Sequence, residues 1–202
     1  MSPTLSVKSV ICNACIALLA STSFLELFSR FPLLSPVDQL DFQTIDKGSS
    51  LHLLFPGFGG PDANTRRIIN NLSSRAEKNE KVVCYDWMKY RGNILRASFN
   101  GQSVGRILGK QLALNMDVNQ LHCIGISVGS FAADACISEF TKIRKKMKLL
   151  EGSPKPSTDT RLTLLCPFQQ RGLFDAGYGA KHFGKTSDFC EQFYIADDPG
   201  NF

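Results

Sequence analysis

The sequence predicts an α/β protein in which a mostly parallel sheet carries helices on both faces. Short apolar runs typical of buried strands alternate with longer stretches that repeat with the period of a helix. Hydrophobic residues make up 43% of the 202 residues and charged residues 20%, which is the composition of a globular chain. A chain of this length is long enough for one domain with a sizeable core.

An apolar segment, residues 1–34, precedes the predicted domain of residues 37–202. No charged residue occurs from Ser9 to Leu25. Such a stretch is typical of a signal peptide. It is also just long enough to cross a bilayer as an uncleaved signal anchor. An amphipathic N-terminal helix is the third interpretation.

The residues that follow the apolar centre bear on the destination of the chain. Ser21-Thr22-Ser23 are small, as a signal peptidase requires. Phe24 behind them resembles the cleavage sites used for plastid import in algae with secondary plastids. We therefore expect a secretory, endomembrane or plastid location if the segment is cleaved. If it is retained, the protein is anchored to a membrane and contacts it through residues 9–28.

The predicted domain opens with two strands and a helix. Apolar and polar residues alternate over 40–45, as in a half-buried strand, whereas 51–55 is apolar throughout, as in a strand covered on both faces. A glycine-rich loop then leads to a helix over 64–78, with Asp62 or Asn64 as its N-cap. The same patterns predict the remaining elements, strands at 81–87, 121–125, 162–166 and 193–196 and helices at 102–114 and 128–148.

One pentapeptide points to a chemistry. Ser127 lies in Gly125-Ile126-Ser127-Val128-Gly129, between an apolar strand and an amphipathic helix. This G-x-S-x-G pattern is the sequence form of a nucleophile elbow, the sharp turn that raises a serine hydroxyl above the end of a strand. The glycines two positions either side leave room where the strand and the helix cross closely. The N–H groups at the start of the helix favour a negative charge that develops beside Ser127.

A second motif, Pro56-Gly57-Phe58-Gly59-Gly60, follows an earlier strand. With this loop and the elbow, the chain resembles the α/β-hydrolase family, particularly its lipase and esterase branch, over about residues 42–196. The resemblance implies that Ser127 is the nucleophile and that the Val128 N–H is one donor of the oxyanion hole. It also implies that the Phe58 N–H is the second donor. Losing one such donor typically costs about 100- to 1,000-fold in rate.

The acid of the family's catalytic triad is not where the resemblance places it. Lipase-like members carry it directly after the sixth strand, in a Leu-Asp-Pro context, and this chain has Leu165-Cys166-Pro167 there. A thiol cannot orient an imidazole and stabilise its cation as a carboxylate does. The alternative acids are Asp175, if residues 169–174 fold back, and Asp197 or Asp198 after the last predicted strand.

The chain has three histidines that bear on the base of the triad. His52 and His122 begin predicted strands, at the end of the sheet away from Ser127, and we expect them to be structural. His182 is the remaining candidate base. It precedes the last predicted strand, whereas the family's histidine follows it. The resemblance therefore implies a domain that is incomplete at its C-terminus.

Two functions remain open at this point. The first is a serine hydrolase of carboxylic esters or lipids that forms an acyl-enzyme, inactive in this form if no base reaches Ser127. The second is a non-catalytic α/β-hydrolase-fold protein that binds an apolar ligand or a protein partner. No cofactor and no metal centre are predicted. The net charge of +5 is modest and the basic run at 144–148 closes a helix without interleaved aromatic residues, so no nucleic-acid partner is expected.

Overall fold

The computed structural model describes residues 7–31, 36–41, 45–151 and 158–195. With η denoting a 3₁₀ helix, its elements are α1 (Val7–Arg30), β1 (Ser50–Phe55), α2 (Ala63–Arg75), β2 (Glu80–Cys84), η2 (Met88–Tyr90), α3 (Ile94–Asn115), β3 (Gln120–Ile126), η3 (Ser127–Gly129), α4 (Ser130–Glu151), β4 (Asp159–Leu165), α5 (Tyr178–His182) and β5 (Phe189–Phe193).

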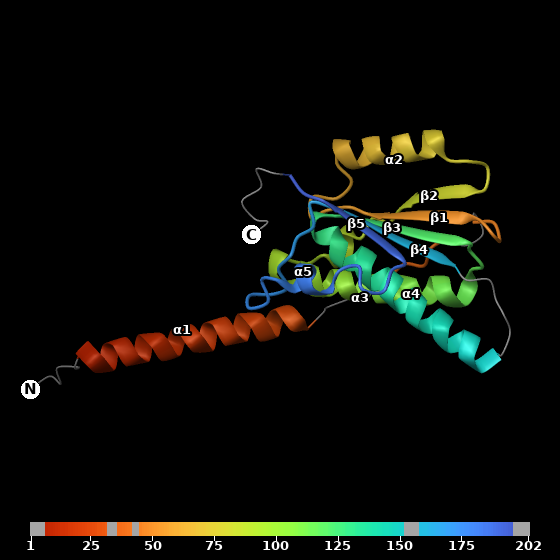
Figure 1. Cartoon of the computed structure of the whole chain (residues 1–202). Coiled ribbons are helices and arrows are strands. Elements are labelled where there is room, and N and C mark those ends of the chain that lie inside the picture. The colour runs from red at the N-terminus through yellow and green to blue at the C-terminus, as the bar shows by residue number, and fades with distance from the viewer. Residues whose placement is uncertain (1–6, 32–35, 42–44, 152–157, 196–202) are drawn as a thin grey trace, which may run out of the picture.

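Five strands form one sheet in the order β2-β1-β3-β4-β5, and every neighbouring pair is parallel. The helix α2 lies over one face of the sheet, and α3, α4 and α5 lie over the other (Figure 1). Parallel neighbours need a crossover connection, and these helices supply it. The predicted α/β architecture is therefore confirmed.

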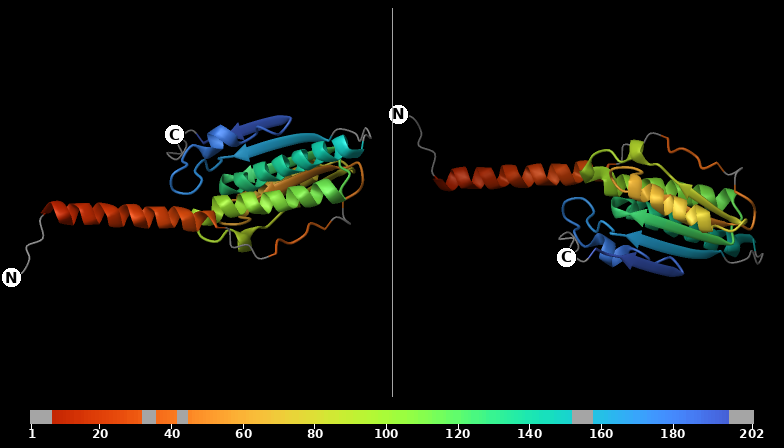
Figure 2. Two further views of the ribbon diagram at one scale, coloured as in Figure 1. Left: turned by 90° about the horizontal axis from the view of Figure 1, so that it is seen from below. Right: turned by 90° about the horizontal axis from the view of Figure 1, so that it is seen from above.

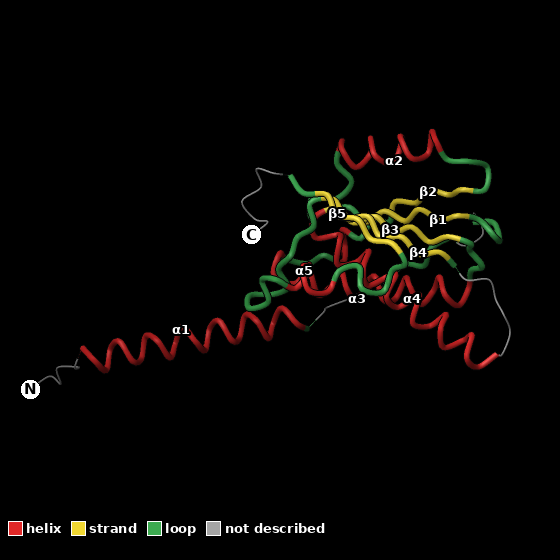
Figure 3. The backbone as a smooth tube through the Cα atoms, viewed as in Figure 1, coloured by secondary structure: helices red, strands yellow, loops and turns green. Residues whose placement is uncertain are grey.

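The winding of the chain reverses between β1 and β3. From β1 the chain passes through α2 to β2 on one side, and from β2 it passes through α3 to β3 on the other side (Figure 3). In an open parallel sheet, ligands bind beyond the carboxyl ends of the strands at such a reversal. The segments that follow β1 and β3 are the two motifs singled out in the sequence.

The core lies between the sheet and the layer formed by α3 and α4. Alternate residues of the central strands point into this layer, because successive side chains of a strand face opposite ways. Its fully buried large side chains include Leu51, Leu53, Phe55 and Leu121 from the strands and Leu108, Leu112, Phe131, Ile137 and Phe140 from the helices. Each such side chain stabilises the fold by about 1.5–3 kcal/mol, so this layer contributes strongly to holding the sheet in place.

The N-cap residues mark the starts of α2 and α3 better than the periodicity of apolar residues does. Asp62 is the N-cap of α2, and its side chain accepts the Thr65 N–H at 2.7 Å. The helix α3 begins at Ile94, well before the predicted start at residue 102. Asn93 fixes this start because its side chain accepts the Arg96 N–H at 3.1 Å.

Two strand predictions are corrected. The described residues of the predicted strand at 40–45 are not in a strand, and residues 42–44 lie outside the described part of the chain. Leu40 and Ile45 are buried against the core, so their apolar character serves packing and not strand pairing. The last strand is Phe189–Phe193 and ends where the predicted one began.

The helix α1 contains the apolar N-terminal segment and projects away from the rest of the protein (Figure 1; Figure 2). Within the described residues it is the one helix that is long and apolar enough to cross a membrane, over Val10–Arg30. Signal sequences share these properties, so the helix is compatible with a signal peptide and with a membrane anchor.

Candidate active site

Ser127 lies on a strained turn between β3 and α4. Its φ angle is 50°, in the left-handed region that residues other than glycine rarely adopt. That conformation costs roughly 1–2 kcal/mol and persists only where the surrounding structure enforces it. The Ser127 side chain is half-buried. A strand, a left-handed serine and a helix in this order are the geometry expected of a nucleophile elbow.

The two glycines of the pentapeptide explain how the turn is enforced. A Cβ on Gly125 would lie 2.6 Å from the Ser130 Cα, and a Cβ on Gly129 would lie 2.3 Å from the Phe55 carbonyl oxygen. The obstacles are backbone atoms, which cannot rotate away as a flexible side chain can. A side chain at either position would therefore force the strand and the helix apart.

The loop that follows β1 lies directly beside Ser127. A Cβ on Gly57 would lie 3.5 Å from the Ser127 Cβ, and the Gly60 N–H closes a turn by donating to the Gly57 carbonyl at 3.1 Å. Phe58 is inside this turn, and within the described residues its N–H donates to no backbone carbonyl. The Val128 N–H belongs to the first helical turn after β3, where N–H groups have no partner within the helix.

Two side chains that the sequence did not single out hold this loop. Trp87 is fully buried, and its Nε1–H donates to the Pro56 carbonyl at 2.8 Å. Arg91 is also buried, donates from Nη1 to the Gly57 carbonyl at 2.8 Å, and stacks its guanidinium over the Phe58 ring at 5.4 Å. Burial lowers the pKa of Arg91, and a nearby carboxylate opposes that shift. A cation therefore lies beside the loop that carries the Phe58 N–H.

The segment after β4 also reaches the elbow. Cys166 has a φ angle of 46°, and its N–H donates to the Phe193 carbonyl at 2.7 Å. Two residues later, the Phe168 N–H donates to the Ser127 carbonyl at 3.1 Å. The position that the family resemblance gives to the acid is thus next to Ser127 along the sheet edge, and it holds a thiol.

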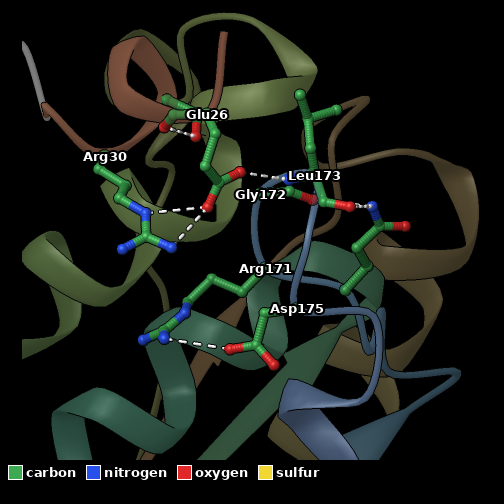
Figure 4. Close-up of polar contacts among 8 residues, drawn as sticks. Glu26, Arg30, Arg171, Gly172, Leu173 and Asp175 are labelled. Atoms are coloured by element: carbon green, nitrogen blue, oxygen red, sulfur yellow. Dashed lines mark hydrogen bonds and ion pairs between the residues drawn. The ribbon is translucent and has the colours of Figure 1, made fainter. Parts of the chain in front are cut away.

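The candidate acid Asp175 and the candidate base His182 are not hydrogen-bonded to each other. Asp175 forms an ion pair with Arg171, with 3.1 Å between Oδ2 and Nη2 (Figure 4). His182 is exposed and stacks on the Tyr178 ring at 4.3 Å between centroids. Within the described residues, no hydrogen bond links the His182 ring or the Ser127 hydroxyl to a carboxylate. The other two candidate acids, Asp197 and Asp198, lie outside the described residues.

The two remaining histidines form a polar row on one face of the sheet. The Nδ1 atoms of His52 and His122 are 3.0 Å apart, and His122 Nε2 is 2.8 Å from Thr163 Oγ1. The Thr163 hydroxyl in turn donates to Glu191 Oε1 at 2.7 Å. Because that donation makes Thr163 an acceptor for His122, the network assigns the proton of His122 to Nε2. Neither ring contacts Ser127.

The described residues bring together no group of three or more His, Cys, Asp or Glu side chains that could hold a metal ion. The seven cysteines are all free thiols.

Comparison of the chain with protein-family models, with curated proteins and with solved structures finds no match. The fold defines the class of protein, an α/β protein with an all-parallel five-stranded sheet. The function must then be inferred from the geometry at the carboxyl edge of that sheet.

Proposed function

We propose that the protein is a serine hydrolase of carboxylic esters or lipids, with Ser127 as the nucleophile of an α/β-hydrolase-like site. The observation that supports this most is the left-handed conformation of Ser127 at the reversal point of the sheet. Two glycines maintain it, at positions where a Cβ would lie 2.6 Å or less from backbone atoms. A serine with a purely structural role has no need of a conformation that costs stability.

In the proposed reaction, Ser127 Oγ attacks the carbonyl carbon of the ester. The Oγ–C bond forms as the carbonyl π electrons move to oxygen, and the N–H groups of Phe58 and Val128 donate to the resulting oxyanion. The bond to the alcohol oxygen then breaks, and the alcohol leaves with the proton that Ser127 Oγ has given up. Water attacks the acyl-enzyme, its hydroxyl group completes the carboxylic acid, and its other proton returns to Ser127 Oγ as the Oγ–C bond breaks. Arg91 positions the Gly57–Phe58 turn and adds positive charge beside it.

A second candidate function has its own support. Asp175 is paired with Arg171 and His182 stacks on Tyr178, so neither is arranged to take the proton of Ser127. A serine without such a base is a poor nucleophile at neutral pH. The alternative is therefore a non-catalytic protein that binds an apolar ligand or a partner at the same edge.

A fluorophosphonate probe separates the two functions. An activated serine attacks the phosphorus of the probe and displaces fluoride. The hydrolase should therefore be labelled, and Ser127→Ala should not. Ser130→Ala is a matched control, because the Ser130 hydroxyl lies one helical turn away, is buried and has no hydrogen-bond partner within the described residues. It should label like the parent. A folded parent protein that is not labelled would contradict the hydrolase and favour the binding protein.

A further inference from the structure

We propose that α1 is retained as a membrane anchor and that its docked end turns the carboxyl edge of the sheet, with Ser127, toward the bilayer. The partner is a lipid bilayer, and the acyl substrate is a lipid within it. The identity of the substrate rests on the proposed function, whereas the placement at the membrane rests on α1 and on the surface around its end.

The surface of α1 is apolar on all sides and is not covered by the domain. Within the span Val10–Arg30, the buried residues are Glu26 and Ser29, both near the end that meets the domain. Its large exposed apolar side chains include Val10, Ile11, Ile16, Leu18, Leu19 and Phe24. A helix that is apolar all round requires an apolar environment, and the described residues of the domain do not provide one.

The polar groups and the length of α1 fit a bilayer. The Thr22 hydroxyl donates to the Leu18 carbonyl at 3.0 Å, so it has a partner within the helix, as a lipid environment demands. The uncharged stretch at residues 9–25 is about 25 Å long at the rise of an α-helix. That length is at the lower end of the range of membrane-spanning helices.

The charged end of α1 is bound to the domain. The Glu26 carboxylate is buried, accepts the Leu173 N–H at 2.6 Å and pairs with Arg30 at 2.8 Å (Figure 4). Ser29 is fully buried and donates to the Glu26 carbonyl at 2.7 Å. The first charge after the apolar stretch is therefore held in protein, which places the boundary of the bilayer close to Leu25.

A second contact fixes the direction of the helix. Arg96, in the first turn of α3, donates from Nε to the Phe28 carbonyl at 3.2 Å, and its guanidinium lies 3.4 Å from the centre of the Phe28 ring. Leu173 and Arg96 come from separate segments, so α1 is held at two points. From there it continues beyond the carboxyl edge, roughly along the direction of the strands, in both views of Figure 2.

The same edge exposes large apolar side chains, each more than a third accessible, at Phe58, Met88, Ile94, Phe168, Phe174 and Ile195. All of them follow the carboxyl ends of strands that run parallel, so they lie on one edge of the sheet. Large exposed apolar side chains that gather at one edge are typical of an interaction surface. Because an apolar helix of spanning length leaves from this edge, we infer that the surface meets lipid.

Tryptophan quenching by lipids with brominated acyl chains tests this placement in the full chain. Trp87 is the only tryptophan and is fully buried, so it gives a constant background. Phosphatidylcholine vesicles that carry the full chain should quench Phe174→Trp at least twofold more than the parent. Leu149→Trp, at the opposite edge and exposed, is the matched control and should match the parent. Equal quenching at both positions would overturn the proposal, as would a chain that self-associates and does not float with the vesicles.

The contact at Glu26 is tested on the same two reporters. Glu26→Ala removes the acceptor of the Leu173 N–H, so the protein should still float with vesicles while the contrast between the reporters is lost. Gly172→Ala should act in the same way from the domain side, because its Cβ would lie 2.6 Å from Glu26 Oε2. A contrast that survives both changes would show that the docked end does not orient the domain.

The difference in quenching between Phe174→Trp and Leu149→Trp should also persist when Ser127→Ala is added, because the placement at the membrane requires no turnover. A chain that shows the contrast but is not labelled by a fluorophosphonate would thus contradict the hydrolase alone.

Discussion

Replacing Gly129 by alanine tests whether the close crossing at the elbow sets both stability and reactivity. The new Cβ would lie 2.3 Å from the Phe55 carbonyl oxygen and 2.7 Å from that of Pro56, whereas ordinary contact begins at 3.4 Å. The end of β1 or the start of α4 must therefore move by about 1 Å. Overpacking of this kind typically costs about 1–3 kcal/mol in the free energy of unfolding.

The same movement should impair the chemistry more than the fold. Pro56 leads into the turn that carries the Phe58 N–H, so a displaced Pro56 carbonyl displaces the oxyanion donor. A misplacement of about 1 Å can cost about 100-fold in rate. We therefore expect Gly129→Ala to unfold at lower urea concentration and to react with a fluorophosphonate about 100-fold more slowly than the parent.

Gly59→Ala is the control for both measurements. Nothing lies within 4 Å of a Cβ at that position in the same loop. It should change the free energy of unfolding by less than about 0.5 kcal/mol, as surface substitutions do, and should label normally. If Gly129→Ala unfolds and labels like Gly59→Ala, the steric argument for the elbow is wrong. If it is destabilised but labels normally, the loop after β1 does not supply the donor.

The remaining predictions concern charge. Arg91→Met removes the hydrogen bond to the Gly57 carbonyl and should lower the rate of fluorophosphonate labelling about tenfold. The rate of Arg91→Lys should lie between those of Arg91→Met and the parent. Equal rates in all three proteins would show that Arg91 does not support the site. Burial raises the pKa of Asp134 to about 6, so the protonated side chain contributes to stability at low pH. That contribution should be lost as pH rises from about 4 to 6, which lowers the free energy of unfolding by up to about 3 kcal/mol. Burial, then His52 and Arg161, lower the pKa of His122 to about 4, so stability should also fall as pH drops from about 6.5 to 4. On acidification these two effects oppose each other, and Asp134→Asn retains only the effect of His122. Urea unfolding should therefore show a steeper loss of stability on acidification in Asp134→Asn than in the parent. Parallel pH profiles of stability in the two proteins would refute the role of Asp134.

The sequence predicted most of the fold because the buried strands and helices carry strong apolar patterns. The central strands are apolar over their whole length, which leaves little choice of element. The edge strand β5 was displaced in the prediction because Phe189 to Phe193 include Glu191 and Gln192 and none of the five residues is fully buried, so the strand lacks a continuous apolar pattern. The start of α3 was missed because Ser98, Asn100 and Gly101 resemble a loop in the sequence. The helix nevertheless begins at Ile94, because Asn93 is its N-cap.

The candidate site was predictable where a local motif encodes geometry. The elbow and the loop at Gly57 and Phe58 lie side by side, as the family resemblance implied. Trp87 and Arg91 had no such signal, because their role depends on contacts with carbonyl groups that are distant in sequence. The same is true of Glu26, whose partner Leu173 is far along the chain.

The polar row of His52, His122, Thr163 and Glu191 has a consequence for how the strands align. Its hydrogen bonds join β1, β3, β4 and β5 in one line across the sheet. A slip of one residue in any of these strands would turn its member of the row into the apolar core beneath α3 and α4. Apolar strands alone tolerate such slips, so this row selects a single alignment. In that alignment, Ser127 and the loop after β1 meet at the same level of the sheet.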